Sequence, residues 1–146
     1  MSPRRSPATA LGKADFEKLS AFRFQLTRFL RFSERAAKQA GITPLQYLLL
    51  LHLRGYPGRD WATVGELAAR LQASAHGTAA LVSRCEAQGY VERMRSSADH
   101  RCVEIRLTRK AGALLNRVAA LHREELRALA AMLPGSLTRL DDDHDQ

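Results

Sequence analysis

The chain has 146 residues, of which 45% are hydrophobic, so it can bury the core of one domain and is not disordered throughout. Its formal net charge is +8, and because residues 141–146 hold four acids and no lysine or arginine, residues 1–140 carry 23 basic against 11 acidic groups, or +12. This excess favours polyanionic partners, although a basic surface that only keeps a protein soluble has the same composition.

The first third of the chain predicts a basic arm and two helices. Residues 1–14 are rich in Pro, Ser, Arg and Ala, which predicts a flexible arm. Asp15 can cap a helix over residues 15–40, whose apolar stripe comprises Phe16, Leu19, Phe22, Leu26, Phe29, Leu30 and Ala37. Thr43 and Gln46 form a capping box for a second helix over residues 44–54, which is apolar on almost every side and should therefore be buried. Residues 55–62 predict a turn-rich connection.

Residues 63–107 predict a helix–turn–helix followed by a β-hairpin. A capping box begins a helix over residues 63–71, a tight turn occupies 72–74, and Ser74 caps a helix over residues 75–88. The inward positions of that helix should be Ala75, Thr78, Leu81, Val82 and Cys85. Two strands, 90–95 and 102–107, flank a polar basic loop at 96–101. Such a helix fits the major groove while the hairpin reaches the neighbouring minor groove or backbone, so this order of elements indicates duplex DNA.

Thr108 should cap a last long helix that runs to about residue 132 and is stopped by the Pro-Gly pair 134–135. We expect the acidic tail, residues 134–146, to be disordered. The apolar stripes of helices 15–40 and 108–133 are larger than one small domain can cover, so we expect these helices to pair in a homodimer. The predicted fold class is mainly α with a small β-hairpin: a winged helix–turn–helix with long terminal dimerisation helices.

Four segments together resemble the MarR (multiple-antibiotic-resistance regulator) family of winged-helix transcription factors. They are residues 41–47 (GITPLQY), 64–68 (VGELA), 88–93 (QGYVER) and 99–108 (DHRCVEIRLT), and the resemblance spans residues 15–133 as one domain. It implies a homodimer on a pseudo-palindromic operator, with DNA binding relieved by a small ligand, often aromatic or phenolic. The chain departs from the family in its short acidic C-terminus and in Gly112, which lies one residue later than usual.

Candidate DNA contacts lie on the second helix of the reading unit and on the hairpin loop. Small residues allow close approach to the groove, His76 or Arg84 could reach a guanine edge, and serines suit phosphates. By resemblance Arg101 enters the minor groove, while Asp99 orients the loop with Arg93 as its expected partner. The alternative is that these residues are only helix caps, helix formers and a solvated loop. The full set is Ser74, His76, Gly77, Thr78, Ala79, Ser83, Arg84, Arg95, Ser96, Ser97, His100 and Arg101.

An effector cleft is implied by the resemblance alone, near Arg23, Arg28, Tyr47 and His52, which could pair with a carboxylate or phenolate. Surface and core packing is the alternative for each of these residues. Cys85 and Cys102 are expected to be structural thiols.

No other chemistry is indicated by the sequence. The five histidines and two cysteines have no metal-ligand spacing, and no phosphate loop or nucleophile motif occurs, so we expect no metal, no cofactor and no enzymatic activity. The N-terminus shows no signal segment and no apolar run could cross a bilayer, so we expect the cytoplasm. Two alternatives to a specific regulator stay open: an architectural protein that binds DNA of any sequence, and an interaction module that has lost DNA recognition. Gly77, Ala79 and Arg101 argue against the second.

Overall fold

The structure is a computed structural model that describes residues 10–131. Its elements are α1 (Lys13–Gln39), α2 (Pro44–Arg54), β1 (Trp61–Ala62), α3 (Val64–Leu71), α4 (Ala75–Ala87), β2 (Val91–Arg95), β3 (Val103–Leu107) and α5 (Arg109–Leu121). Phe32–Arg123 form one compact unit, and the described residues before 32 and after 123 belong to a second. Most of the predicted arm, and all of the acidic tail, lie outside the described residues. No helix within residues 10–131 is long and apolar enough to cross a membrane.

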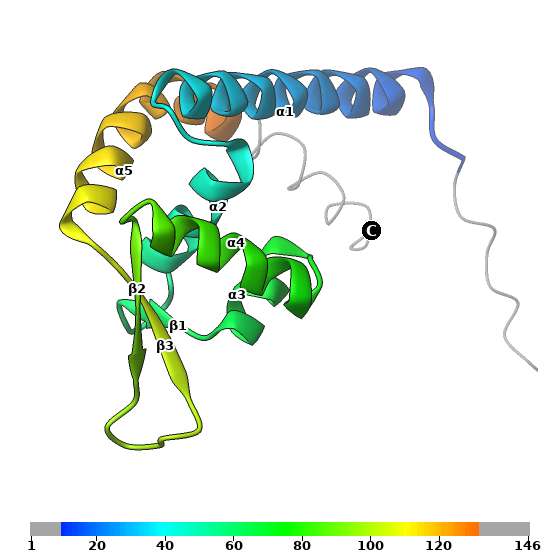
Figure 1. The fold of residues 1–146 in the computed structure, drawn as a ribbon. Helices are drawn as coiled ribbons and strands as arrows, with labels where there is room; N and C mark the ends of the chain where they lie inside the picture. The colour runs from blue at the N-terminus through cyan, green and yellow to red at the C-terminus, as the bar shows by residue number, and fades with distance from the viewer. Residues whose placement is uncertain (1–9, 132–146) are drawn as a thin grey trace, which may run out of the picture. The chain divides into compact units, whose positions relative to one another are not determined.

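The larger unit is the predicted winged helix–turn–helix, mainly helical with a small antiparallel sheet. The sheet has the order β1-β3-β2, and β2 pairs with β3 from Val91 opposite Leu107 to Arg95 opposite Val103. The far end of this hairpin, called the wing below, extends away from the helices (Figure 1). The core joins side chains from the helices and the sheet, so every element is fixed to the others by apolar burial. Its largest fully buried members include Leu49, Leu50, Leu53, Leu67, Val82, Val91, Ile105 and Val118.

Local capping sets the helix starts in this unit where the sequence predicted them. Thr43 with Gln46, and Thr63 with Glu66, each form a complete capping box. Ser74 accepts a hydrogen bond from the Gly77 amide, and Thr108 accepts one from the Ala111 amide. Each cap satisfies amide groups that the first turn of a helix leaves without a partner.

Two expectations for the first helices are wrong. α1 begins at Lys13, so Asp15 is not its cap but lies in its first turn, where its carboxylate accepts from the Gly12 amide at 3.0 Å. α2 is not buried on all sides: Tyr47, Leu49, Leu50 and Leu53 are buried, whereas Leu45, Leu48 and Leu51 are exposed. Because leucines occur on every side of α2, the sequence alone does not indicate which face packs against the rest of the unit.

The predicted last helix is interrupted. α5 ends at Leu121, His122 forms a turn, and helical residues resume over 123–131. The buried His122 ring stacks on Tyr47 at 5.5 Å and meets Phe32 edge-on, and its Nδ1 lies 2.7 Å from the Val118 carbonyl oxygen. The His122 amide therefore donates to Ala119, one residue nearer than an α-helix requires. The predicted end near residue 132 lies outside the described part of the chain.

Two smaller differences concern positions 61–62 and 75. The predicted connection contains strand β1, in which Trp61 pairs with Arg106 and Ala62 with Ile105. Ala75, expected in the core, is exposed in the first turn of α4, while the other four inward positions are buried.

Candidate nucleic-acid interface

The turn between α3 and α4 has the tight geometry of a helix–turn–helix. Gln72 adopts the left-handed conformation, with φ 54° and ψ 42°, at the end of α3. The Ala73 amide donates to the Ala68 carbonyl at 3.0 Å, which closes the last turn of α3. Ser74 then caps α4 at once, so the two helices are joined by three residues and pack side by side. This connection presents α4 as the recognition helix.

The outer side of α4 carries most of the predicted contacts. His76, Gly77 and Arg84 are exposed, Ala79 is half-buried, and the cap residue Ser74 is exposed at the start of the helix. A Cβ atom added at Gly77 would lie 3.0 Å from the Ser74 hydroxyl oxygen. Glycine here therefore keeps the cap undisturbed, besides leaving the helix surface flat.

Two predicted contacts on α4 have their polar groups engaged within the protein. Thr78 is buried, and its hydroxyl donates to the Ser74 carbonyl at 2.8 Å, so it is not available to a base. The Ser83 hydroxyl donates to the Ala79 carbonyl at 3.1 Å and accepts from Arg93 Nη2 at 2.8 Å. A phosphate offers only acceptors, so Ser83 could bind one only by giving up its bond to Ala79.

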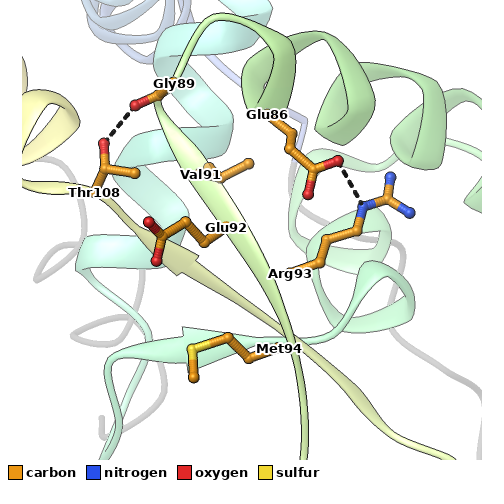
Figure 2. Close-up of a pocket in the computed structure, with 7 residues that line it drawn as sticks. All are labelled: Glu86, Gly89, Val91, Glu92, Arg93, Met94 and Thr108. Atoms are coloured by element: carbon orange, nitrogen blue, oxygen red, sulfur yellow. Dashed lines mark hydrogen bonds and ion pairs between the residues drawn. The ribbon is translucent and has the colours of Figure 1, made fainter.

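Arg93 does not have the partner that the resemblance implied. Instead of pairing with Asp99, its guanidinium lies 3.8 Å from the Glu86 carboxylate and bonds to Ser83 on α4. Figure 2 shows Arg93 and Glu86 turned toward each other between β2 and α4. Arg93 therefore braces the wing against the recognition helix.

The loop of the wing is shaped by its own short polar side chains. The Asp99 carboxylate accepts from the Arg101 amide at 3.0 Å, and the Ser96 hydroxyl oxygen accepts from the Ala98 and Asp99 amides. The loop closes where the Ser96 amide donates to the Cys102 carbonyl. Asp99 thus bonds to the backbone of the loop and not to the Arg93 side chain. Ser96 is half-buried and shapes the loop as well; the exposed predicted contacts of the wing are Arg95, Ser97, His100 and Arg101.

Within the described residues, some arginines of the unit have acidic partners and others have none. Arg59 pairs with Glu66, and Arg106 pairs with Asp60 and Glu104 around β1 and β3. Among residues 10–131, Arg84 on α4 and Arg95 and Arg101 on the wing form no ion pair, and all three are exposed. The recognition helix and the wing therefore carry exposed arginines without acidic partners in the described part of the chain, as do α2, α3 and α5 through Arg54, Arg70, Arg109 and Arg117.

The predicted effector residues are divided between the two compact units. Arg23 and Arg28 are exposed on α1 in one compact unit, whereas Tyr47 and His52 belong to α2 in the other. Burial raises the pKa of the Tyr47 hydroxyl; burial, and then the nearby Arg70 charge, lower the pKa of His52. None of the four lines the open groove beside β2 in Figure 2, which is formed by Glu86, Gly89, Val91, Glu92, Arg93, Met94 and Thr108.

Both cysteines are free thiols. Cys85 is fully buried on the inner side of α4, and burial raises its pKa to about 11 although Arg84 acts in the opposite direction. Cys102 is half-buried next to β3. Among the described residues, no group of three or more His, Cys, Asp or Glu side chains is placed to hold a metal ion.

The family model described as "MarR family" matches residues 40–101, which run from the end of α1 to the wing. Over this segment the chain is similar to MarR-family proteins. No curated protein sequence matches the chain.

Solved MarR-family structures share the fold over nearly the whole chain. A MarR family protein from Bacillus stearothermophilus is 22% identical with a TM-score of 0.72, covering 94% of this chain and 100% of that one. The transcriptional regulator Tm0710 from Thermotoga maritima is 25% identical with a TM-score of 0.63, covering 88% and 89%. A mutant of S. aureus MepR, solved bound to an oligodeoxyribonucleotide, is 20% identical with a TM-score of 0.63, covering 85% and 95%.

Sequence reasoning missed the internal partners of Ser83 and Arg93. The signal available was spacing, because Ala79, Ser83 and Glu86 share one side of α4 at helical intervals. That side meets β2 only once the hairpin is folded back, which the sequence pattern did not specify.

Proposed function

We propose that the protein is a transcriptional regulator that binds a pseudo-palindromic operator as a homodimer and acts as a repressor, relieved by a small ligand such as an aromatic or phenolic acid. One recognition helix of each protomer reads a half-site in the major groove, and Arg101 enters the adjacent minor groove. The family-model match over residues 40–101 and the fold shared with the DNA-bound MepR mutant support this proposal.

The observation that carries the proposal is the set of exposed, unneutralised arginines on α4 and the wing. Arg84 lies on the same helix as the flat surface around Gly77, and Arg101 lies at the loop of the wing. A bidentate arginine can discriminate guanine in the major groove, and an arginine in a narrow minor groove responds to A·T-rich sequence.

The homodimer is supported by apolar side chains that neither compact unit buries. Phe16, Leu19, Phe24 and Leu30 of α1 are each more than half exposed. A stable folded monomer is not expected to leave such a surface in water, so a second copy is the proposed cover. Sedimentation at micromolar concentration tests this part, and a stable folded monomer contradicts it.

Ligand relief rests on the family resemblance, with Arg28 and Tyr47 as the groups first to be tested. A panel of phenolic acids should lower operator affinity by binding better to a state with another half-site spacing. If DNA binding is specific and no compound shifts it, the regulator stands without an aromatic effector.

The main experiment selects bound fragments from random DNA and then titrates the selected duplex and a scrambled duplex at one fixed salt concentration. The wild type should prefer the selected duplex by at least about 10³-fold. Arg101→Ala should weaken operator binding by about 1–3 kcal/mol, roughly 5- to 150-fold, without a change in folding, because the exposed Arg101 guanidinium makes no hydrogen bond or ion pair within residues 10–131.

Arg117→Ala is the matched control, since it removes the same charge from α5, outside the recognition helix and the wing. An equal effect of the two substitutions would mean that Arg101 supplies only general charge. Equal affinity of the wild type for both duplexes would favour the architectural DNA-binding protein, which the basic composition alone would also allow.

A further inference from the structure

The C-terminal end of the recognition helix is held by side chains from two distant segments. Gln46 Nε2, at the start of α2, donates to Gln88 Oε1 at 2.8 Å, and Lys110 Nζ, at the start of α5, donates to the Gln88 carbonyl at 2.7 Å. The Thr108 hydroxyl donates to the Gly89 carbonyl at 2.6 Å, a bond that Figure 2 shows at the top of β2. Gln88 is the C-cap of α4, so the bonds from Lys110 and Thr108 satisfy carbonyls at and just after the helix end, whereas the Gln46 bond joins two side chains.

Gln46 is oriented before it meets Gln88. Its Oε1 accepts from the Thr43 amide at 3.1 Å in the capping box, which turns its NH2 group outward from α2. The residue is only 5% exposed, so little water competes for its hydrogen bonds. The buried Gln46 amide therefore connects the first turn of α2 to the exposed C-cap residue of α4.

Lys110 adds a charge to the same end. Its ammonium group lies 4.7 Å from the centre of the Tyr90 ring, and it bonds to the Gln88 carbonyl. A cation at this place is favoured by the negative end of the helix dipole and by the ring face. The two contacts give Lys110 one defined position beside Gln88.

The inner side of α4 offers few directional contacts of its own. It is buried through Leu81, Val82, Cys85 and the Thr78 methyl, and the polar contacts that add to this packing are those of Arg93 with Ser83 and Glu86 and those at the Gln88 end. α4 has 13 residues and is about 20 Å long, so a small tilt at Gln88 becomes a larger displacement at Ser74 and His76. Discrimination between bases requires good hydrogen-bond geometry at that end.

We propose that Gln46, Gln88 and Lys110 form a positioning junction that sets the direction of the recognition helix and thereby the sequence selectivity of DNA binding. This inference rests on the proposed function. None of the three residues needs to touch DNA for the junction to act, so they are positioning residues. Because the junction joins the first turns of α2 and α5 to Gln88, a displacement of either helix is transmitted to α4 at this point.

A double-mutant cycle tests the junction with Gln46→Glu, Gln88→Glu and both together. The Gln46→Glu variant keeps the capping box, and its new carboxylate can accept from a Gln88 amide that has turned over. In the Gln88→Glu variant the new carboxylate still accepts from Gln46. In the double variant two carboxylates face each other, and neither has an N–H group to donate to the other. Each single variant adds one negative charge and keeps a hydrogen bond between positions 46 and 88, so it controls for the added charge.

The readout is the ratio of the dissociation constants for the selected and scrambled duplexes at fixed salt, measured with the urea-unfolding free energy of each variant. General electrostatic effects on affinity act on both duplexes and cancel in this ratio. We expect each single variant to keep the wild-type ratio within about threefold, and the double variant to lose at least about tenfold beyond the product of the singles.

Each outcome decides a separate question. Coupling in the unfolding free energy with an unchanged duplex ratio assigns the junction to stability and overturns the inference, as does the absence of any coupling. A wild type that does not distinguish the two duplexes overturns the proposed function itself and the inference with it.

Discussion

Glu66 is the residue whose removal should most clearly loosen the start of α3. Its carboxylate accepts from the Thr63 amide at 3.0 Å and from the Tyr56 hydroxyl at 2.7 Å, and it binds the Arg59 guanidinium. The Arg59 guanidinium lies over the Tyr56 ring at 4.5 Å and the Trp61 ring at 3.9 Å. Glu66→Ala leaves these donors without their acceptor and removes one half of a capping box.

The expected loss can be added from the separate bonds. The Tyr56 bond to a charged acceptor contributes about 1.5 kcal/mol and the capping bond about 0.5–1 kcal/mol. The Arg59 pair adds only about 0.5–1 kcal/mol, because the two side chains are 26% and 29% exposed and water screens them. The free energy of unfolding should therefore fall by about 2–4 kcal/mol, which for a chain of this size lowers the melting temperature by roughly 6–13 °C.

Urea unfolding at one fixed protein concentration measures this loss, since the stability of the proposed dimer depends on concentration. Glu66→Gln is the matched control: it retains an acceptor for Thr63 and loses the charge that binds Arg59, so it should cost about half as much. A loss below about 1 kcal/mol for Glu66→Ala would refute the reasoning, because the cluster would then contribute no more than an exposed ion pair.

Three further predictions concern single side chains. In the folded protein at pH 8, a thiol reagent should modify Cys102 and spare Cys85, whose pKa is raised to about 11 by burial; equal rates would contradict this. The pKa of His52 is lowered in the folded state, so the unfolded chain binds this proton at a higher pH than the folded chain does. The free energy of unfolding should therefore fall as the pH drops below about 6.5, and level off below the folded pKa. His52→Gln should flatten this dependence in unfolding titrations at several pH values. Gly77→Ala should stabilise α4 by about 1 kcal/mol in a Ser74→Ala background, because alanine favours a helix more than glycine does. With Ser74 present the gain should be clearly smaller, since the new Cβ crowds the cap hydroxyl. Identical changes in melting temperature in both backgrounds would show that the Ser74 cap adapts without cost.

The parts of the fold that the sequence predicted well are those encoded locally. Thr43, Thr63, Ser74 and Thr108 each cap a helix by accepting from an amide three residues along the chain, so the starts of α2, α3, α4 and α5 could be predicted from the sequence. The recognition helix and the wing followed from these starts and from the alternation in β3.

What the sequence could not supply depends on distant partners. Strand β1 has two residues and exists only because Trp61 meets Arg106 in β3. The break at His122 requires the rings of Tyr47 and Phe32, which belong to other helices. Local propensity favours a continuous helix there, and only tertiary packing interrupts it.

The partner of Arg93 was mispredicted for the same reason. The family resemblance pointed to Asp99 within the hairpin, but the side of β2 that carries Arg93 faces α4, where Glu86 and Ser83 lie. Which face of a hairpin a helix covers is a property of the assembled unit and not of the strand alone.

The unequal pairing of arginines also bears on how fast and in which orientation the proposed regulator meets DNA. Arg59 and Arg106 have their charge balanced by neighbouring carboxylates, so they contribute little to the field at a distance. Arg84, Arg95 and Arg101 are not balanced in this way and add positive charge at the recognition helix and the wing, alongside Arg54, Arg70, Arg109 and Arg117 on other elements, which also form no ion pair within the described residues. The attraction that brings the protein to a duplex should therefore come from the whole unit, and the orientation on DNA should be set by close contacts after the first encounter. Added salt should slow association because it screens this charge.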